Sequence, residues 1–126
     1  MLLSLDVLAE DDAAIRRLVS GFLEGLGYQV LTVPDGVAAM EVAHSWHGEI
    51  HLLLTDFIMP VLGGRELAEK LKSADPGLKV IFISGYAGHA AVDQDLQLGD
   101  LYFLQKPFSM ELLSTTVRNV LDGATP

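Results

Sequence analysis

Five short apolar runs alternate with amphipathic stretches along the chain, and this alternation restricts the fold more than any other feature. Runs rich in Val, Ile and Leu, without strict polar alternation, are typical of parallel strands covered on both faces. We predict strands at residues 2–9, 29–33, 50–55, 79–84 and 101–104. Strands that alternate with helices in this way form a three-layer αβα sandwich with right-handed crossovers.

The amphipathic stretches between the runs predict five helices, at residues 13–26, 36–46, 64–73, 90–98 and 110–121. Asp12, Asp35 and Ser109 precede three of them and are good helix N-caps, so capping is the expected role of Asp12. We expect the first and last helices to turn an apolar stripe inward, consisting of Ile15, Leu18, Val19, Phe22, Leu23 and Leu26 in the first and Leu112, Leu113, Val117, Val120 and Leu121 in the last.

A chain of 126 residues has room for one domain, which we place at residues 1–122 with a flexible tail at 123–126. With 8 Lys and Arg against 17 Asp and Glu, the net charge of −9 argues against direct binding to nucleic acid or to an anionic membrane. The absence of cysteine excludes disulfides, thiolate metal sites and cysteine nucleophiles. No signal peptide or membrane-spanning run is present, so we expect a cytoplasmic protein.

Reactive side chains follow four of the five predicted strands. Glu10 and Asp11 follow the first strand, Asp56 follows the third, Ser84 ends the fourth, and Lys106 follows the fifth. Ligands of open α/β sheets bind at the carboxyl ends of the strands, where the strand order reverses. If the second strand, which ends without a reactive group, lies at an edge, the order 2-1-3-4-5 brings all these side chains together.

Several carboxylates in one place repel one another unless a cation neutralises them. Oxygen ligands without His or Cys suit Mg²⁺, with Mn²⁺ as a second choice, and Mg²⁺ commonly completes its shell with a phosphate. Lys106 and Ser84 are suited to phosphoryl oxygens. The group therefore predicts phosphoryl chemistry, with Asp56 as the nucleophile that forms an aspartyl phosphate.

Four motifs in this order resemble the response-regulator receiver domain of two-component signalling, which has a flavodoxin-like fold. They are Glu10-Asp11, the run 52–56 with Met59-Pro60 and Gly64 behind it, Ile83-Ser84-Gly85, and Lys106-Pro107-Phe108. The segments 64–67 and 84–88 resemble receivers attached to hybrid sensor histidine kinases. The resemblance implies a phosphorelay component that catalyses only its own phosphorylation and dephosphorylation.

By the same resemblance, Asp56 is the phospho-acceptor, and Glu10, Asp11, Asp56 and the backbone carbonyl of Ile58 bind the metal. Ser84 and Phe103 are similar to the switch hydroxyl and the switch aromatic of the family, Lys106 pairs with the phosphoryl group, and the Lys106-Pro107 bond is expected to be cis.

The implied phosphoryl donor is a sensor histidine kinase or a histidine phosphotransfer protein. The implied output surface for a downstream protein is formed by the helix at 90–98, the strand at 101–104 and the helix at 110–121. Receivers can also pair through this surface, so a homodimer stays open, as do the cognate kinase, the stimulus and the output.

Two other functions stay open at this point. An aspartyl-phosphate phosphohydrolase would need a general acid two residues after the nucleophile, where this chain has Ile58. A flavodoxin-like binding module fits the acidic residues poorly, because carboxylates repel a flavin phosphate.

Overall fold

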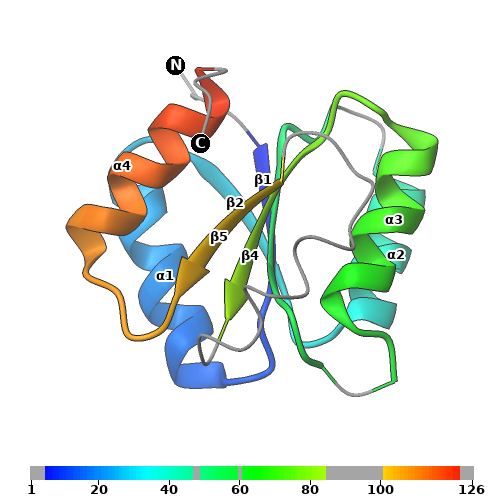
Figure 1. Cartoon of the computed structure of the whole chain (residues 1–126), viewed down its shortest axis with the longest axis horizontal. Helices are drawn as coiled ribbons and strands as arrows, with labels where there is room; N and C mark the ends of the chain where they lie inside the picture. Colours follow the sequence, from blue (N-terminus) through cyan, green and yellow to red (C-terminus); the bar gives the residue numbers. More distant parts are fainter. Residues whose placement is uncertain (1–4, 47–48, 60, 85–100, 123–126) are drawn as a thin grey trace.

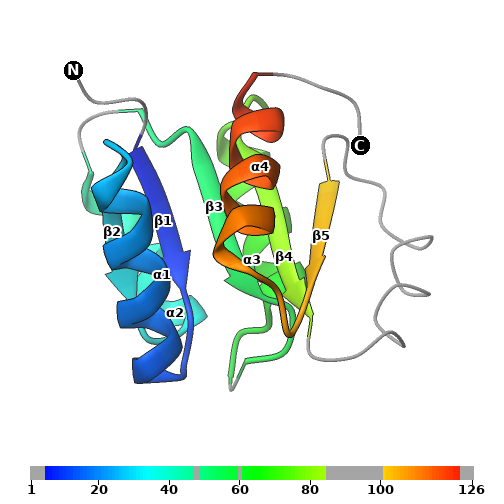
Figure 2. The same cartoon turned by 90° about the vertical axis from the view of Figure 1, so that its left-hand side faces the viewer.

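Five parallel strands form one sheet in the computed structural model, which describes residues 5–46, 49–59, 61–84 and 101–122. Their order is β2-β1-β3-β4-β5, as Figure 2 shows from left to right. The strands are β1 (Leu5–Ala9), β2 (Gln29–Val33), β3 (Leu52–Asp56), β4 (Lys79–Ser84) and β5 (Leu101–Gln105). The predicted strand order and the edge position of β2 are confirmed.

Helices cover both faces of the sheet (Figure 1). On one face lie α1 (Ala13–Gly25) and α4 (Met110–Leu121), and on the other lie α2 (Gly36–Ser45) and α3 (Gly64–Ala74). This arrangement confirms the three-layer sandwich. The helix predicted at 90–98, the first three residues of the strand predicted at 2–9, and the tail at 123–126 lie outside the described residues.

The predicted N-caps are in place. Oδ1 of Asp12 accepts hydrogen bonds from the backbone N–H groups of Ala14 at 2.9 Å and Ile15 at 3.1 Å. Asp35 caps α2 and Ser109 caps α4 in the same way, each through one bond to a first-turn amide. These bonds satisfy amides that have no partner within the helix, and they fix where each helix begins relative to the strand before it.

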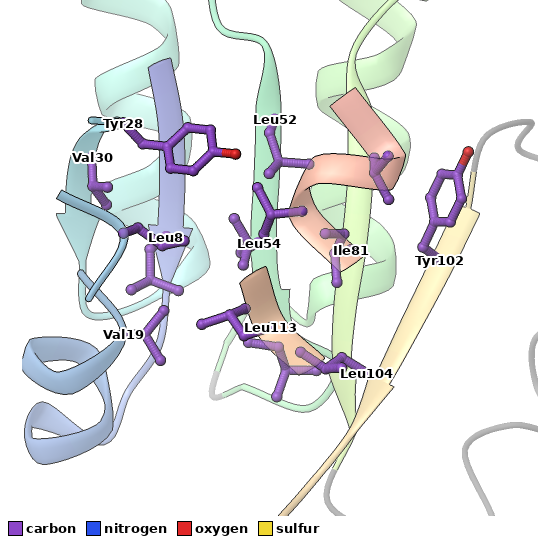
Figure 3. Close-up of a cluster of buried hydrophobic side chains, with 14 residues drawn as sticks. Leu8, Val19, Tyr28, Val30, Leu52, Leu54, Ile81, Tyr102, Leu104 and Leu113 are labelled. Carbon is purple, nitrogen blue, oxygen red and sulfur yellow. The ribbon is translucent and has the colours of Figure 1, made fainter. Parts of the chain in front are cut away.

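Two hydrophobic clusters hold the layers together, one on each face of the sheet. Figure 3 shows the cluster between the sheet and helices α1 and α4, which includes Leu8, Val19, Leu54 and Leu113. The second cluster packs α2 and α3 onto the opposite face. All five residues of β3 are buried, which explains why this strand lacks polar alternation.

The apolar stripes of α1 and α4 are narrower than the sequence predicts. Leu18 and Leu26 of the α1 segment are 58% and 43% exposed, and Leu112 of α4 is 48% exposed. Their predicted inward orientation is wrong, because α1 buries Val19 and Leu23 instead, and α4 buries Leu113, Val117 and Val120.

In the described part of the chain, no helix has both the length and the apolar character needed to cross a membrane.

Candidate functional site

Three carboxylates meet where β1 and β3 end. Asp56 is the last residue of β3, and Glu10 and Asp11 directly follow β1, the strand that pairs with β3. One oxygen from each lies within 4.8 Å of the others. Glu10 is fully buried, Asp56 is 6% exposed, and Asp11 is exposed to solvent. The structure thus brings together the acidic residues that the sequence placed at these strand ends.

Lys106 supplies the positive charge of this group. Its Nζ lies 3.1 Å from Oε1 of Glu10 and 3.1 Å from Oδ1 of Asp56. Its backbone N–H donates to the carbonyl oxygen of Ser84 at 2.7 Å, which ties the end of β5 to the end of β4. The Lys106-Pro107 peptide bond is cis, as expected. One ammonium group therefore bridges two of the three carboxylates.

Burial governs the ionisation of Asp56. The loss of solvent around its side chain raises its pKa above the ordinary value of 3.8, and the hydrogen bond and charge of Lys106 oppose this shift without cancelling it. Asp56 is therefore a more basic carboxylate than one on the surface.

A divalent cation suits the donors present. Oε2 of Glu10 is buried and has no hydrogen-bond partner among the described residues. A buried carboxylate oxygen without a partner is costly, and a metal ion is a natural partner for it. Three carboxylates without a nearby His or Cys are the ligand type that Mg²⁺ prefers. The residues fit this ion.

The turn after β3 holds the Asp56 backbone against the start of α3. The N–H of Phe57 donates to the Ile83 carbonyl at 2.9 Å, and the N–H of Gly64 donates to the Phe57 carbonyl at 2.9 Å. A Cβ at Gly64 would collide with the carbonyl oxygen of Asp56. Only glycine permits this close approach. Within the same turn, Val61 has φ of 68°, a strained value for a β-branched residue.

The other predicted site residues lie around this centre. Ser84 is buried at the carboxyl end of β4, and the side chain of Ile58 is 60% exposed in the turn after β3. Phe103 of β5 is partly buried, and its ring centroid lies 5.2 Å from that of Phe82 and 6.0 Å from that of Phe57.

Two residues of this region were not predicted from the sequence. Phe57 follows the acceptor candidate and joins the aromatic group of Phe82 and Phe103. Arg16, in the first part of α1, donates from Nη1 to the backbone carbonyl of Glu10 at 2.7 Å. The sequence pointed to neither, since an aromatic at a strand end and an arginine off an apolar stripe are common without such contacts.

Comparisons with known proteins identify the family of this chain. The model of the response regulator receiver domain family matches residues 7–118. The response regulator receiver protein CpdR of Brucella abortus is 36% identical over 94% of this chain and 97% of its own length. The sensor kinase CckA of the same organism is 36% identical over 92% of this chain but only 12% of its own length.

A solved structure of the receiver domain from the hybrid histidine kinase CckA has a TM-score of 0.79 and 32% identity, covering 93% of this chain and 98% of that one. Proteins of this family are signalling regulators, and membership does not favour the phosphohydrolase or the flavin-binding alternative. The chain belongs to the response regulator receiver domains of two-component signal transduction.

Proposed function

We propose that Asp56 is the phospho-acceptor of this receiver domain. The observation that carries the proposal is the position of the Asp56 carboxylate, which lies 3.1 Å from the Lys106 ammonium and within 4.8 Å of an oxygen of Glu10 and an oxygen of Asp11. A carboxylate that contacts a cation and lies close to two further acids is suited to attack an electrophilic phosphorus when a metal offsets the negative charge.

In the proposed reaction an oxygen of Asp56 attacks the phosphorus of a phosphohistidine. The new O–P bond forms as the P–N bond breaks, the electron pair stays on the imidazole nitrogen, and that nitrogen takes a proton from solvent. Lys106 stabilises the negative charge on the phosphoryl oxygens, because its ammonium already lies at the acceptor carboxylate.

The proposed ligands of Mg²⁺ are Glu10, Asp11, Asp56 and the backbone carbonyl of Ile58. The unpartnered, buried Oε2 of Glu10 supports this assignment. When bound, the ion supplies positive charge that neutralises the carboxylates and the incoming phosphoryl oxygens. The exposed Asp11 lies on the solvent side, where a hydrated ion can enter.

The proposed switch consists of Ser84 and Phe103. Ser84 ends β4 close to the Lys106 backbone, and Phe103 lies on the neighbouring strand, three residues before Lys106. A hydroxyl that bonds the phosphoryl group would shift the equilibrium between two arrangements of the aromatic side chain. We propose that a downstream protein reads this change around β5 and α4.

The proposed donor is a phosphohistidine on a sensor histidine kinase or a phosphotransfer protein. The similarity of this chain to CpdR and to part of CckA supports this class of partner.

Intact-mass measurement after incubation with acetyl phosphate and MgCl₂ tests the acceptor. We expect one added phosphoryl group on the wild-type protein, none on Asp56→Asn, and none when EDTA removes the metal. Asp12→Asn is the matched control, because Asp12 caps α1 in the same acidic segment and asparagine also caps helices. An adduct on Asp56→Asn, or none on the wild type, would contradict the proposal.

A further inference from the structure

We infer that Arg16 is a positioning residue that holds the turn carrying Glu10 and Asp11 in the conformation needed to bind the metal. This inference rests on the proposed function. Arg16 lies within α1, and its side chain reaches back across the turn, where Nη1 donates to the Glu10 carbonyl at 2.7 Å. A guanidinium is always charged and its hydrogen bonds to oxygen are strong, so this contact firmly links the helix to the end of β1.

The backbone of Glu10 is thereby held on both sides. Its N–H donates to the carbonyl of Val33, at the end of β2, at 3.1 Å. Its carbonyl accepts from Arg16. Two residues later, the side chain of Asp12 is committed to capping α1. The turn is therefore fixed at residues 10 and 12, and Asp11 lies between the two fixed points.

The side chain of Asp11 is less restrained than the residues on either side of it. It is exposed, and no described residue donates a hydrogen bond to its carboxylate or forms an ion pair with it. One of its oxygens nevertheless lies within 4.8 Å of oxygens of Glu10 and Asp56, which repel it. The fixed backbone on either side keeps Asp11 near the other two carboxylates against this repulsion, and Arg16 supplies one of the fixing bonds.

The charge of Arg16 and its hydrogen bond act on metal binding in opposite directions. A positive charge next to an acidic site repels Mg²⁺, so removing the charge alone should strengthen binding. Removing the bond should weaken binding, because the ligands lose their arrangement, and residues that orient metal ligands commonly change affinity 10- to 100-fold, as a rough guide. Weaker binding after the loss of Arg16 therefore identifies positioning and cannot come from charge.

Calorimetric titration of the whole chain with MgCl₂ tests the inference. We expect Arg16→Met, which keeps the length and loses every donor, to raise the Kd for Mg²⁺ about tenfold. Arg16→Lys, which keeps the charge and one donor group, should fall between this variant and the wild type. The control is Arg17→Met, because Arg17 carries the same charge next to it on α1 but its side chain is exposed. Its Kd should be unchanged or lower.

A second measurement separates positioning from a direct role in the reaction. The phosphorylation rate with acetyl phosphate should fall in Arg16→Met at low MgCl₂ and return to the wild-type rate at saturating MgCl₂. An unchanged or lower Kd in Arg16→Met would overturn the inference. If Arg16→Met does not fold, Arg16→Lys decides, and a Kd equal to that of the wild type would count against the role. Failure of the wild type to bind Mg²⁺ would instead overturn the proposed metal site.

Discussion

Nζ of Lys106 lies 3.1 Å from Oδ1 of Asp56, so the candidate acceptor contacts a cation that follows β5, two strands further along the chain. The same Nζ contacts Glu10, whose carboxylate is fully buried. Lys106 therefore offsets part of the negative charge that Glu10 and Asp56 bring to the strand ends, and the effect of changing one of these residues depends on the contacts that the other two lose.

Asp56→Asn should stabilise the protein when no metal is present. Burial raises the pKa of Asp56 in the folded state, so ionising this carboxyl costs folding free energy. This cost to folding is absent below the ordinary pKa. It grows as the pH rises from the ordinary pKa to the raised pKa, and it stays constant above that. At pH 7 in EDTA we expect the free energy of unfolding of Asp56→Asn to exceed that of the wild type by about 1 kcal/mol, which corresponds to about 4 °C in Tm.

The difference between Asp56→Asn and the wild type should shrink as the pH falls, because protonation relieves the wild-type protein of the same cost. Thermal unfolding of both proteins across a pH series gives the comparison. A gain that persists unchanged in acid would show that ionisation is not its source.

Lys106→Met should destabilise the metal-free protein. It removes the partner of the buried Glu10 carboxylate, and breaking a buried pair commonly costs about 3 to 5 kcal/mol. Because the Lys106 side chain is 27% exposed, we expect a smaller loss, about 2 kcal/mol in urea unfolding. Addition of MgCl₂ should restore part of it, since the ion replaces the missing positive charge.

The control for Lys106→Met is Lys70→Met, an exposed lysine of α3, which should change the free energy of unfolding by less than about 0.5 kcal/mol. Equal losses in the two variants would mean that the charge balance around Glu10 contributes nothing specific.

Gly64→Ala should damage the turn that follows Asp56. The added methyl group collides with the Asp56 carbonyl. We expect the free energy of unfolding to fall by about 3 kcal/mol, the upper end of the range for overpacking. Gly21→Ala is the matched control, because Gly21 lies within α1 with open space around its Cβ position. At this position alanine should raise the free energy of unfolding by about 0.5 to 1 kcal/mol. Similar effects in the two variants would refute the close-packing explanation.

Ile58→Asn should shorten the lifetime of the phosphorylated protein. The exposed Ile58 side chain lies two residues after Asp56 and offers an attacking water no hydrogen bond, so we expect slow loss of the phosphoryl group in the wild type. Asparagine can orient a water, and the decay should become roughly tenfold faster, less than a true general base contributes.

Decay of the acyl phosphate, followed by intact mass, measures the effect of Ile58→Asn. Val61→Asn provides the same change in the same turn at a residue that is 92% exposed, and it should leave the rate unaltered. If both substitutions accelerate decay equally, the position of Ile58 has no special role.

The fold and the charged members of the site could be predicted because both follow from short-range patterns. The common direction of parallel strands places residues such as Glu10 and Asp56 at one edge of the sheet, wherever the helices pack. Asp12 was identified as a cap because capping depends on the next three residues alone.

The features that the sequence did not reveal depend on tertiary packing. Leu18 and Leu112 belong to apolar stripes, yet each lies beyond the width of the helix contact, which only the packed layers define. The bond from Arg16 to Glu10 depends on the path of a long side chain across a turn. No sequence pattern distinguishes Arg16 from an ordinary surface arginine.

The burial of β3 has a consequence for how a signal leaves this domain. The strand lies between β1 and β4, and all five of its residues are buried. Its backbone amides should exchange hydrogen with solvent only when the whole domain unfolds, whereas edge elements such as β5 can exchange through smaller openings. Asp56 therefore ends the strand that we expect to open last, so a chemical change there should reach a partner through the less protected elements around it.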